Sequence, residues 1–227
     1  MAADATHFEI VIPVYGGVDL MDVAAPVEMF DWMGRLWAKR TVTVTLVAQQ
    51  IGPLATRDGL LLTPQREFNA YGDGKRQAQL IWVPGGDPAA LRQLMQGGAY
   101  LEFLRSQSVR ADYVSSVCEG ALLLAAAGLL DGFRATTHWQ FIPCFQAFPH
   151  IQVAEGYPRC VVDRNRITGG GISSGLDEAL TIIALIAGDD IAKDVQMVTQ
   201  YFPCPPFQQQ ITPATACPLD AGTAPAA

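Results

Sequence analysis

The most reactive side chain that the sequence places at a structural corner is the thiol of Cys118. The residues before it, Tyr113–Val117, are typical of a short β-strand, and an apolar helical pattern begins at Gly120. A cysteine at such a strand-to-helix turn stands at the carboxyl end of a sheet, as the serine of a nucleophile elbow does. The helix N-terminus behind it favours a thiolate over a thiol. We therefore expect an accessible, ionised sulfur nucleophile, although a buried, inert cysteine is the more common case.

A pair of glycines follows the strand that precedes the cysteine strand in the sequence. The apolar run Leu80–Val83 stops at Pro84, and Gly85 and Gly86 come directly after it. Their backbone N–H groups, together with the N–H of Glu119, are expected to bind a negative charge that develops on a substrate. An ordinary tight turn is the alternative, because this tripeptide alone is a weak signal.

Two carboxyl groups follow the first expected strand. Asp19 and Asp22 lie at the start of a helical segment, where acidic residues commonly cap the helix and complement its dipole. Either carboxyl is a candidate acid or base for a cysteine. Asp19 suits the capping position, whereas Asp22 stands three residues further in, beside apolar neighbours. Asp22 is therefore the better candidate for a chemical role.

The elements that must position these residues alternate between strands and helices. Short apolar or β-branched runs predict strands, and longer apolar or amphipathic segments predict helices. The expected strands cover residues 8–15, 41–48, 60–63, 80–83, 113–117, 160–162 and 166–168, and the expected helices cover 19–32, 88–104 with a break at 97–98, 120–130, 139–148, 173–187 and 189–202. This alternation predicts an α/β fold with a mostly parallel sheet covered on both faces.

The composition is that of a chain able to bury a sizeable core. Of its 227 residues, 50% are apolar and only 16% are charged, which suggests an oligomer interface. The net charge of −7 argues against nucleic acid as a partner. No apolar run is long enough to span a membrane, and the N-terminus lacks a basic signal segment, so the cytoplasm is the expected location. We expect one domain over residues 1–202 and a proline- and alanine-rich tail over residues 203–227.

The remaining cysteines and the histidines offer no second site. Five cysteines, an odd number without C-x-x-C spacing, argue against a disulfide framework or a zinc ribbon. Inert thiols are expected at Cys144, Cys160, Cys204 and Cys217. None of the three histidines has a partner at metal-ligand spacing, so no metal is expected. His138 is expected to cap and pack a helix, and a cysteine–histidine pair is the weaker alternative.

Several short segments, in this order, together resemble the ThiJ/PfpI superfamily, which is similar in fold to class I glutamine amidotransferases. They are Asp22 with Pro26 and the segments 81–86 (IWVPGG), 116–118 (SVC), 127–132 (AGLLDG), 134–139 (RATTHW) and 168–175 (TGGGISSG). The last two segments and the proline-rich run 201–207 resemble the isocyanide (isonitrile) hydratase branch of this superfamily. Some of the same signatures occur in the amidotransferase-like domains of transcription regulators.

The resemblance implies a flavodoxin-like α/β sandwich, a homodimer and no metal or organic cofactor. It implies that Cys118 is the nucleophile, that Asp22 is its partner carboxyl, and that Ile172 lies against the cysteine after a glycine run that is able to shift. Hydratases of this branch commonly carry threonine after the cysteine, whereas this chain carries Glu119. The second carboxyl either keeps one of two neighbouring carboxyls protonated or points outward without a role.

The expected activity is the hydration of an isocyanide to an N-substituted formamide through a covalent cysteine thioimidate. The expected catalytic residues are Cys118, Asp22 and Glu119, and the expected substrate-binding residues are Gly85, Gly86, Gly170 and Ile172. Two alternatives stay open. One is a cysteine enzyme that acts on α-oxoaldehydes, and the other is a non-catalytic redox- or ligand-sensing domain. The sensing domain is disfavoured because the tail contains no basic helical segment, and a cysteine protease is disfavoured because Glu119 occupies the position of its histidine.

Overall fold

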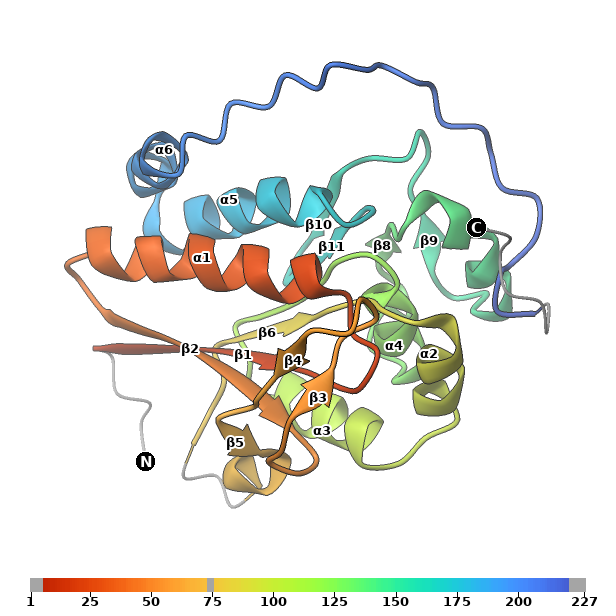
Figure 1. Ribbon diagram of the computed structural model, residues 1–227, viewed down its shortest axis with the longest axis horizontal. Coiled ribbons are helices and arrows are strands. Elements are labelled where there is room, and N and C mark those ends of the chain that lie inside the picture. The colour runs from red at the N-terminus through yellow and green to blue at the C-terminus, as the bar shows by residue number, and fades with distance from the viewer. Residues whose placement is uncertain (1–5, 73–75, 221–227) are drawn as a thin grey trace.

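A seven-stranded sheet forms the centre of the computed structural model, which describes residues 6–72 and 76–220 (Figure 1). The strand order is β10-β11-β7-β6-β1-β2-β5. The strands are β1 (His7–Pro13), β2 (Thr41–Ala48), β5 (Arg66–Glu67), β6 (Leu80–Val83), β7 (Tyr113–Ser116), β10 (Cys160–Asp163) and β11 (Arg166–Gly169). All neighbouring strands are parallel except β10 and β11, which form an antiparallel hairpin. The predicted α/β fold with a mostly parallel sheet is confirmed.

Helices cover both faces of this sheet, as Figure 1 shows. One face carries α1 (Leu20–Leu36), α5 (Ser174–Ala187) and α6 (Asp189–Val198), and the other carries α2 (Pro88–Met95), α3 (Ala99–Ser108) and α4 (Gly120–Ala126). Because both faces are covered, the central strands are apolar on both sides, and every residue of β6 is buried. This double coverage explains why the strands are visible in the sequence as continuous apolar runs.

Short elements complete the fold around the sheet. Two small two-stranded ladders pair β3 (Leu54–Ala55) with β4 (Leu61–Leu62), and β8 (Arg134–Ala135) with β9 (Gln152–Val153). Two 3₁₀ segments are η1 (Phe68–Tyr71) and η2 (Trp139–Ala147). The β3–β4 hairpin brings residue 57 close to the carboxyl edge of the sheet, where the backbone N–H of Arg57 donates to the carbonyl of Val18 at 3.0 Å.

Several helices differ in length from the prediction, and α1 continues to Leu36 instead of residue 32. The predicted break separates α2 from α3, because Gly97 and Gly98 adopt positive φ angles of 121° and 94°. The α4 helix ends at Ala126, two residues before Gly128, which has a φ of 74°. The segment predicted as a helix over 139–148 is a 3₁₀ helix that contains Pro143, which lacks the N–H that a regular helix needs. The last helix ends at Val198 instead of Phe202.

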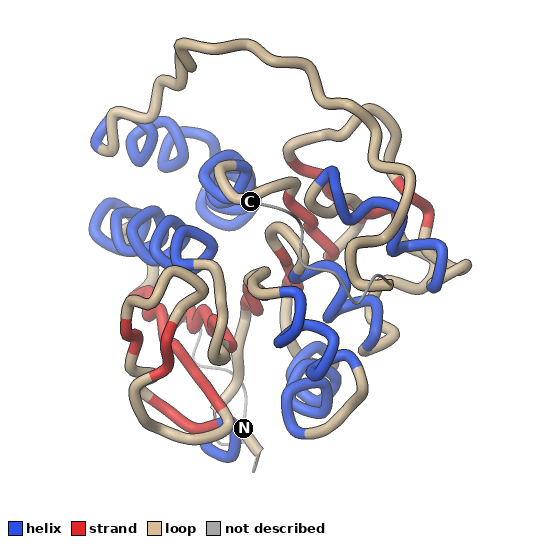
Figure 2. Tube along the Cα trace, turned by 45° about the vertical axis from the view of Figure 1, so that its right-hand side comes forward, coloured by secondary structure: helices blue, strands red, loops and turns tan. Residues whose placement is uncertain are grey.

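The segment after α6 is an extended strap, defined here as residues 203–217. It runs from the end of α6 across the molecule to η2 as one uninterrupted loop (Figures 1 and 2). A disulfide joins Cys144 of η2 to Cys217 at the end of the strap. The prediction that these two cysteines are inert thiols is therefore wrong. They lie 73 residues apart, and only the return of the strap to η2 brings them together.

The other two cysteines of this group are free thiols, as predicted. Cys204 is exposed, and burial raises the pKa of Cys160 to about 12. The last residues of the predicted tail, 221–227, lie outside the described residues. The division into a domain and a tail at residue 202 stays a prediction.

No helix in the described part of the chain combines the length and apolar character needed to cross a bilayer. The cytoplasmic location stays a prediction, and a disulfide is more typical of oxidising compartments.

Replacing both Cys144 and Cys217 by serine should lower the free energy of unfolding. The disulfide closes a loop of 73 residues in the unfolded chain, and such a cross-link typically contributes about 2–4 kcal/mol. Urea denaturation of the double variant measures this loss, and Cys204→Ser is the control because its thiol is exposed and free. Equal stabilities of the double variant and wild type would show that the strap is not covalently held.

Candidate active site

The candidate site lies at the carboxyl edge of the sheet, where the loops that follow four neighbouring parallel strands meet. The loop after β1 leads to Asp22 in the first turn of α1, and the loop after β6 contains Gly85. The turn after β7 carries Cys118, and Ile172 follows β11. Because β11, β7, β6 and β1 are adjacent and parallel, their carboxyl ends lie at the same edge. The structure thus brings the predicted residues together.

Cys118 stands at the predicted sharp turn between β7 and α4. Its φ of 55° lies in the left-handed region, which is strained for a residue other than glycine. Three hydrogen bonds hold the turn. The N–H of Cys118 donates to the carbonyl of Gly170 at 2.9 Å, and its carbonyl accepts from Thr137 Oγ1 at 2.8 Å. The N–H of Val117 donates to the carbonyl of Val83 at 3.1 Å. The strained backbone is therefore fixed by both neighbouring strands.

Gly120 allows this turn to approach β6 closely. A Cβ atom at Gly120 would collide with the carbonyl oxygen of Val83. The absence of a side chain therefore lets α4 start directly on the sheet, as the small residue of a nucleophile elbow does.

The expectation of an accessible, ionised thiol is wrong. Cys118 is only 1% exposed. Burial, followed by the negative charges of Glu119 and Asp22, raises the pKa of the thiol well above its ordinary value, and the nearby N–H of Ile172 lowers it only in part. Burial and the neighbouring carboxyls therefore favour the neutral thiol over the thiolate.

Asp22 is fully buried and firmly oriented. Its Oδ2 atom accepts the N–H of Gly85 at 2.9 Å, while Oδ1 has no hydrogen-bond partner among the described residues. The indole N–H of Trp82 donates to the backbone carbonyl of Asp22 at 2.9 Å. Burial and the charge of Asp19 raise the pKa of the Asp22 carboxyl well above its usual range. Burial therefore favours the protonated form of this carboxyl, and the unpartnered Oδ1 is the atom able to carry the proton.

Gly85, the first glycine after β6, has a different role from the predicted one, and the substrate-binding role of Gly86 stays a prediction. The N–H of Gly85 is not available to a substrate anion, because it already binds Asp22. Gly85 also leaves room for its neighbours, since a Cβ atom there would collide with the Glu119 carboxyl and lie 2.9 Å from Cys118 Cβ. A Cβ atom at Gly86 would lie 2.5 Å from the carbonyl of Gly17 and 2.9 Å from the hydroxyl of Tyr15. Both glycines therefore permit close packing of the loops.

The carboxyl of Glu119 is turned into the protein, not outward. The residue is 5% exposed, and burial raises the pKa of Glu119 to about 7. The interaction between this carboxyl and the neighbouring Cys118 thiol raises the pKa of the thiol and lowers that of the acid. Glu119 thus changes its charge near neutral pH, at a position where it is able to accept the proton of the thiol.

An ion pair beside the site was not predicted from the sequence. Arg57 Nε lies 2.7 Å from Asp19 Oδ1, and Asp19 is 3% exposed. Arg57 comes from the loop of the β3–β4 hairpin, which is distant in sequence from every motif. The positive charge of Arg57 lowers the pKa of Asp19, Asp22 and Glu119, although burial outweighs it at each of them.

One group of donor atoms at the site has a spacing that suits a metal ion. Atoms of Asp19, Asp22 and Cys118 all lie within 4.8 Å of one another. A metal would require Asp22 and Cys118 to release their protons, and the burial of both groups opposes this. The arrangement is better suited to moving protons than to holding an ion.

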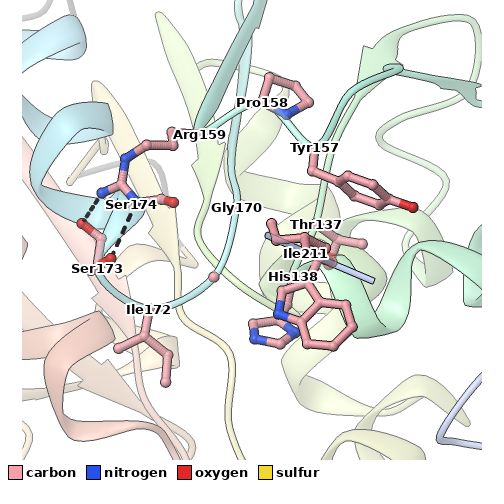
Figure 3. A pocket seen from close by; sticks show the side chains of 12 residues that line it. Thr137, His138, Tyr157, Pro158, Arg159, Gly170, Ile172, Ser173, Ser174 and Ile211 are labelled. Atoms are coloured by element: carbon pink, nitrogen blue, oxygen red, sulfur yellow. Dashed lines mark hydrogen bonds between the residues drawn. The ribbon is translucent and has the colours of Figure 1, made fainter. Parts of the chain in front are cut away.

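A pocket of about 360 Å³ is lined in part by Gly170 and Gly171 of the glycine run after β11 (Figure 3). Its lining includes Thr137, His138, Trp139, Tyr157, Ile172 and Ile211. His138 caps η2 as predicted, because its Nδ1 atom accepts the N–H of Gln140 at 3.2 Å. Its ring lies so close to Gly171 that a Cβ atom there would collide with it.

A fourth carboxyl lies beneath the glycine run. Glu178 of α5 is fully buried, and neither of its carboxylate oxygens has a hydrogen-bond partner among the described residues. Burial, with a contribution from the charge of Asp22, raises the pKa of Glu178 well above its ordinary value. A Cβ atom at Gly169 would collide with this carboxyl. The signal in the sequence is an acidic residue within an apolar helix, which our sequence analysis overlooked.

Comparison with known proteins agrees with this architecture. The model of the DJ-1/PfpI family matches residues 9–185. The isonitrile hydratase of Pseudomonas putida is 42% identical over 166 residues, which cover 73% of this chain and 69% of the hydratase. An HTH-type transcriptional regulator of Rhizobium meliloti is 36% identical over 78% of this chain, which spans about half (52%) of the regulator.

Solved structures show the same fold. A ThiJ/PfpI family protein from Pseudomonas syringae superposes with a TM-score of 0.78 at 34% identity, over 88% of this chain and 78% of its own. DJ-1 of Toxoplasma gondii superposes with a TM-score of 0.72 at 21% identity, over 86% of this chain and all of its own (100%). By sequence and by fold, this chain belongs to the DJ-1/PfpI family.

Proposed function

We propose that this protein is an isocyanide hydratase that converts an isonitrile and water to an N-substituted formamide, with Cys118 as nucleophile. The observation that carries the proposal is the geometry of Asp22. Its Oδ2 atom is held by the Gly85 N–H at 2.9 Å, and its unpartnered Oδ1 atom is left to carry a proton beside the buried thiol. The similarity to the isonitrile hydratase of Pseudomonas putida supports the choice of substrate.

The chemistry of an isocyanide suits such a site. The terminal carbon of R–N≡C becomes electrophilic when it is protonated, so the enzyme needs an acid and a soft nucleophile that act together. Asp22 donates its proton to that carbon while the sulfur of Cys118 forms a bond to it. The thiol proton passes to the Glu119 carboxylate. The product is a thioimidate, R–N=CH–S–Cys, with Asp22 ionised and Glu119 protonated.

Water then completes the reaction. The Asp22 carboxylate takes a proton from a water molecule as its oxygen adds to the thioimidate carbon, and Glu119 returns its proton to the nitrogen. The C–S bond of the resulting tetrahedral adduct breaks, and the hydroxyl proton moves to the departing sulfur. The formamide R–NH–CHO leaves, and the thiol, the Asp22 acid and the Glu119 carboxylate are restored. The low exposure of all three residues excludes bulk water from the first step.

Access to the buried sulfur requires a small movement. Cys118 is covered by the segment from Gly170 to Ile172, whose carbonyl and N–H groups face the cysteine. The glycine run 169–171 provides the backbone freedom for this segment to shift when substrate enters.

Three further expectations belong to this proposal. The substrate is a small molecule, no organic cofactor takes part, and the protein acts as a homodimer. Exposed apolar side chains near the end of α6, namely Met197, Val198 and Phe202, support the dimer, because such side chains are commonly covered by a second copy.

A different cysteine-dependent reaction, on α-oxoaldehydes such as methylglyoxal, is the competing enzymatic function. It would use the same buried thiol. Parallel assays with an aryl isocyanide and with methylglyoxal separate the two functions. Turnover of methylglyoxal alone would favour the competing function, and turnover of neither would favour a sensing role, as in the similar transcription regulators.

Replacing Cys118 by alanine should reduce formamide production to the uncatalysed background, because no other thiol lies at the site. The measurement is the change in ultraviolet absorbance as an aryl isocyanide becomes its formamide. Cys160→Ala is the matched control, since Cys160 is also a free, partly buried thiol with a raised pKa. Formamide production by Cys118→Ala at the wild-type rate would exclude the cysteine mechanism.

Replacing Asp22 by asparagine should lower kcat by about 10²–10⁴-fold, the usual contribution of a positioned acid. The amide keeps the shape of the side chain but cannot donate the proton that the isocyanide carbon needs. Asp19→Asn removes the neighbouring acid of the same cluster and serves as control, with a loss of less than about tenfold. An unchanged kcat for Asp22→Asn would remove Asp22 from the mechanism.

The rate should increase with pH through an apparent pKa of about 7, because Glu119 accepts the thiol proton only when it is ionised. The rate should decrease wherever Asp22 has lost its proton, and burial moves this loss to a higher pH than is usual for an aspartate. The profile of kcat/KM against pH measures both limbs. Glu119→Gln should lose the rise near pH 7, and a profile unchanged by this substitution would rule out Glu119 as the base.

A further inference from the structure

One residue of the strap, Ile211, lies at the pocket next to the candidate active site. Among the described residues, none of residues 203–216 makes a backbone hydrogen bond to the rest of the chain. Most of the strap is exposed, and Phe207 is 86% exposed. Ile211, in contrast, lines the pocket of about 360 Å³ described above and is 44% exposed.

The pocket has the size of a ligand site, and its lining combines apolar side chains with polar ones such as Arg159, Ser173 and Ser174. Trp139 contributes an aromatic side chain to the lining. Tyr157 and Ile172 add aromatic and aliphatic walls, as Figure 3 shows. Pockets that bind small molecules commonly have volumes of about 300–1,000 Å³ and mostly apolar walls. The pocket is thus large enough for an aromatic ring.

The pocket also shares residues with the nucleophile turn. Gly170 lines the pocket, and its carbonyl accepts the N–H of Cys118 at 2.9 Å. Thr137 lines it as well, and its hydroxyl donates to the carbonyl of Cys118 at 2.8 Å. Ile172 presents its side chain to the pocket and its N–H to the thiol. The segment from Gly170 to Ile172 thus contacts both the pocket and Cys118.

The position of Ile211 depends on a covalent anchor. The strap is held by α6 at one end and by the Cys144–Cys217 disulfide at the other. Both cysteines are buried, and the carbonyl of Leu219, just beyond the anchor, accepts a hydrogen bond from Arg92 at 3.4 Å. If the disulfide were absent, no backbone hydrogen bond of residues 203–216, all of which the structure describes, would hold Ile211 at the pocket.

We infer that this pocket receives the apolar R group of the isocyanide, and that Ile211, held in place by the Cys144–Cys217 disulfide, determines which R groups bind well. The inference rests on the proposed hydratase function. It names the substrate class as isocyanides with an aryl or similarly bulky apolar substituent. Small alkyl isocyanides do not reach Ile211 and gain nothing from it.

The test compares a bulky and a small substrate in three variants. Ile211→Ala and the double variant Cys144→Ser/Cys217→Ser should each raise KM for an aryl isocyanide by roughly tenfold, with little change in kcat, because lost apolar contact weakens binding by about this factor. KM for ethyl isocyanide should stay the same. Phe207→Ala is the control, since it removes a larger apolar side chain from the same strap but leaves the pocket lining intact.

Two results of this comparison would overturn the inference. One is an unchanged KM for the aryl isocyanide in Ile211→Ala. The other is an equal change of KM for both substrates, which would indicate a general effect on the enzyme instead of a contact with the R group.

A binding measurement separates failure of this inference from failure of the proposed function. Isothermal titration calorimetry records binding of an N-aryl formamide, the expected product, to Cys118→Ala with and without Ile211→Ala. If formamide binding weakens roughly tenfold in Ile211→Ala but wild type hydrates no isocyanide, the proposed function is refuted. The inference that the pocket binds the apolar group then stands. If wild type hydrates the aryl isocyanide but the formamide binds equally well with and without Ile211→Ala, the proposed function stands. The inference about the pocket is then refuted.

Discussion

The chemistry of this protein depends on the removal of four acidic groups from water at one edge of a sheet. Asp22, Cys118 and Glu119 are each at most 5% exposed, and Glu178 is fully buried beneath them. In a medium of low polarity each group favours its neutral form, and each negative charge raises the pKa of its neighbours. Arg57 supplies positive charge at the rim but does not reverse this effect. The site therefore favours protonated groups, as the isocyanide chemistry proposed above requires.

The backbone makes this crowded arrangement possible. Cys118 is held in a left-handed conformation, with a φ of 55°, by hydrogen bonds to Gly170 and Thr137. Gly85 provides the N–H that orients Asp22 and the empty volume into which the Glu119 carboxyl fits. A side chain at Gly85 would displace both acids at once. The strained backbone at Cys118 and the missing side chains at the glycines have the same effect. Both allow the sulfur and the carboxyl groups to lie close together without water.

Much of this architecture could be predicted from the sequence, because its signals are local. The strands of a sheet covered on both faces are continuous apolar runs, and the strand-to-helix turn at Cys118 follows from the abrupt change between two such patterns. The properties that the sequence did not reveal are those that depend on tertiary packing. The protonation of Cys118 follows from burial, and the role of Gly85 follows from a hydrogen bond to a residue 63 positions away. The ion pair of Arg57 and the Cys144–Cys217 disulfide likewise join segments that are distant in sequence.

We conclude that Cys118 rests as a neutral thiol beside the protonated carboxyl of Asp22, and not as a thiolate. The ultraviolet absorbance of the thiolate, recorded against pH for wild type and for Cys118→Ser, measures this directly in their difference. The account predicts no thiolate from Cys118 at neutral pH, with ionisation only at a pH well above the ordinary value for cysteine. A difference spectrum that shows Cys118 already ionised at neutral pH would contradict it.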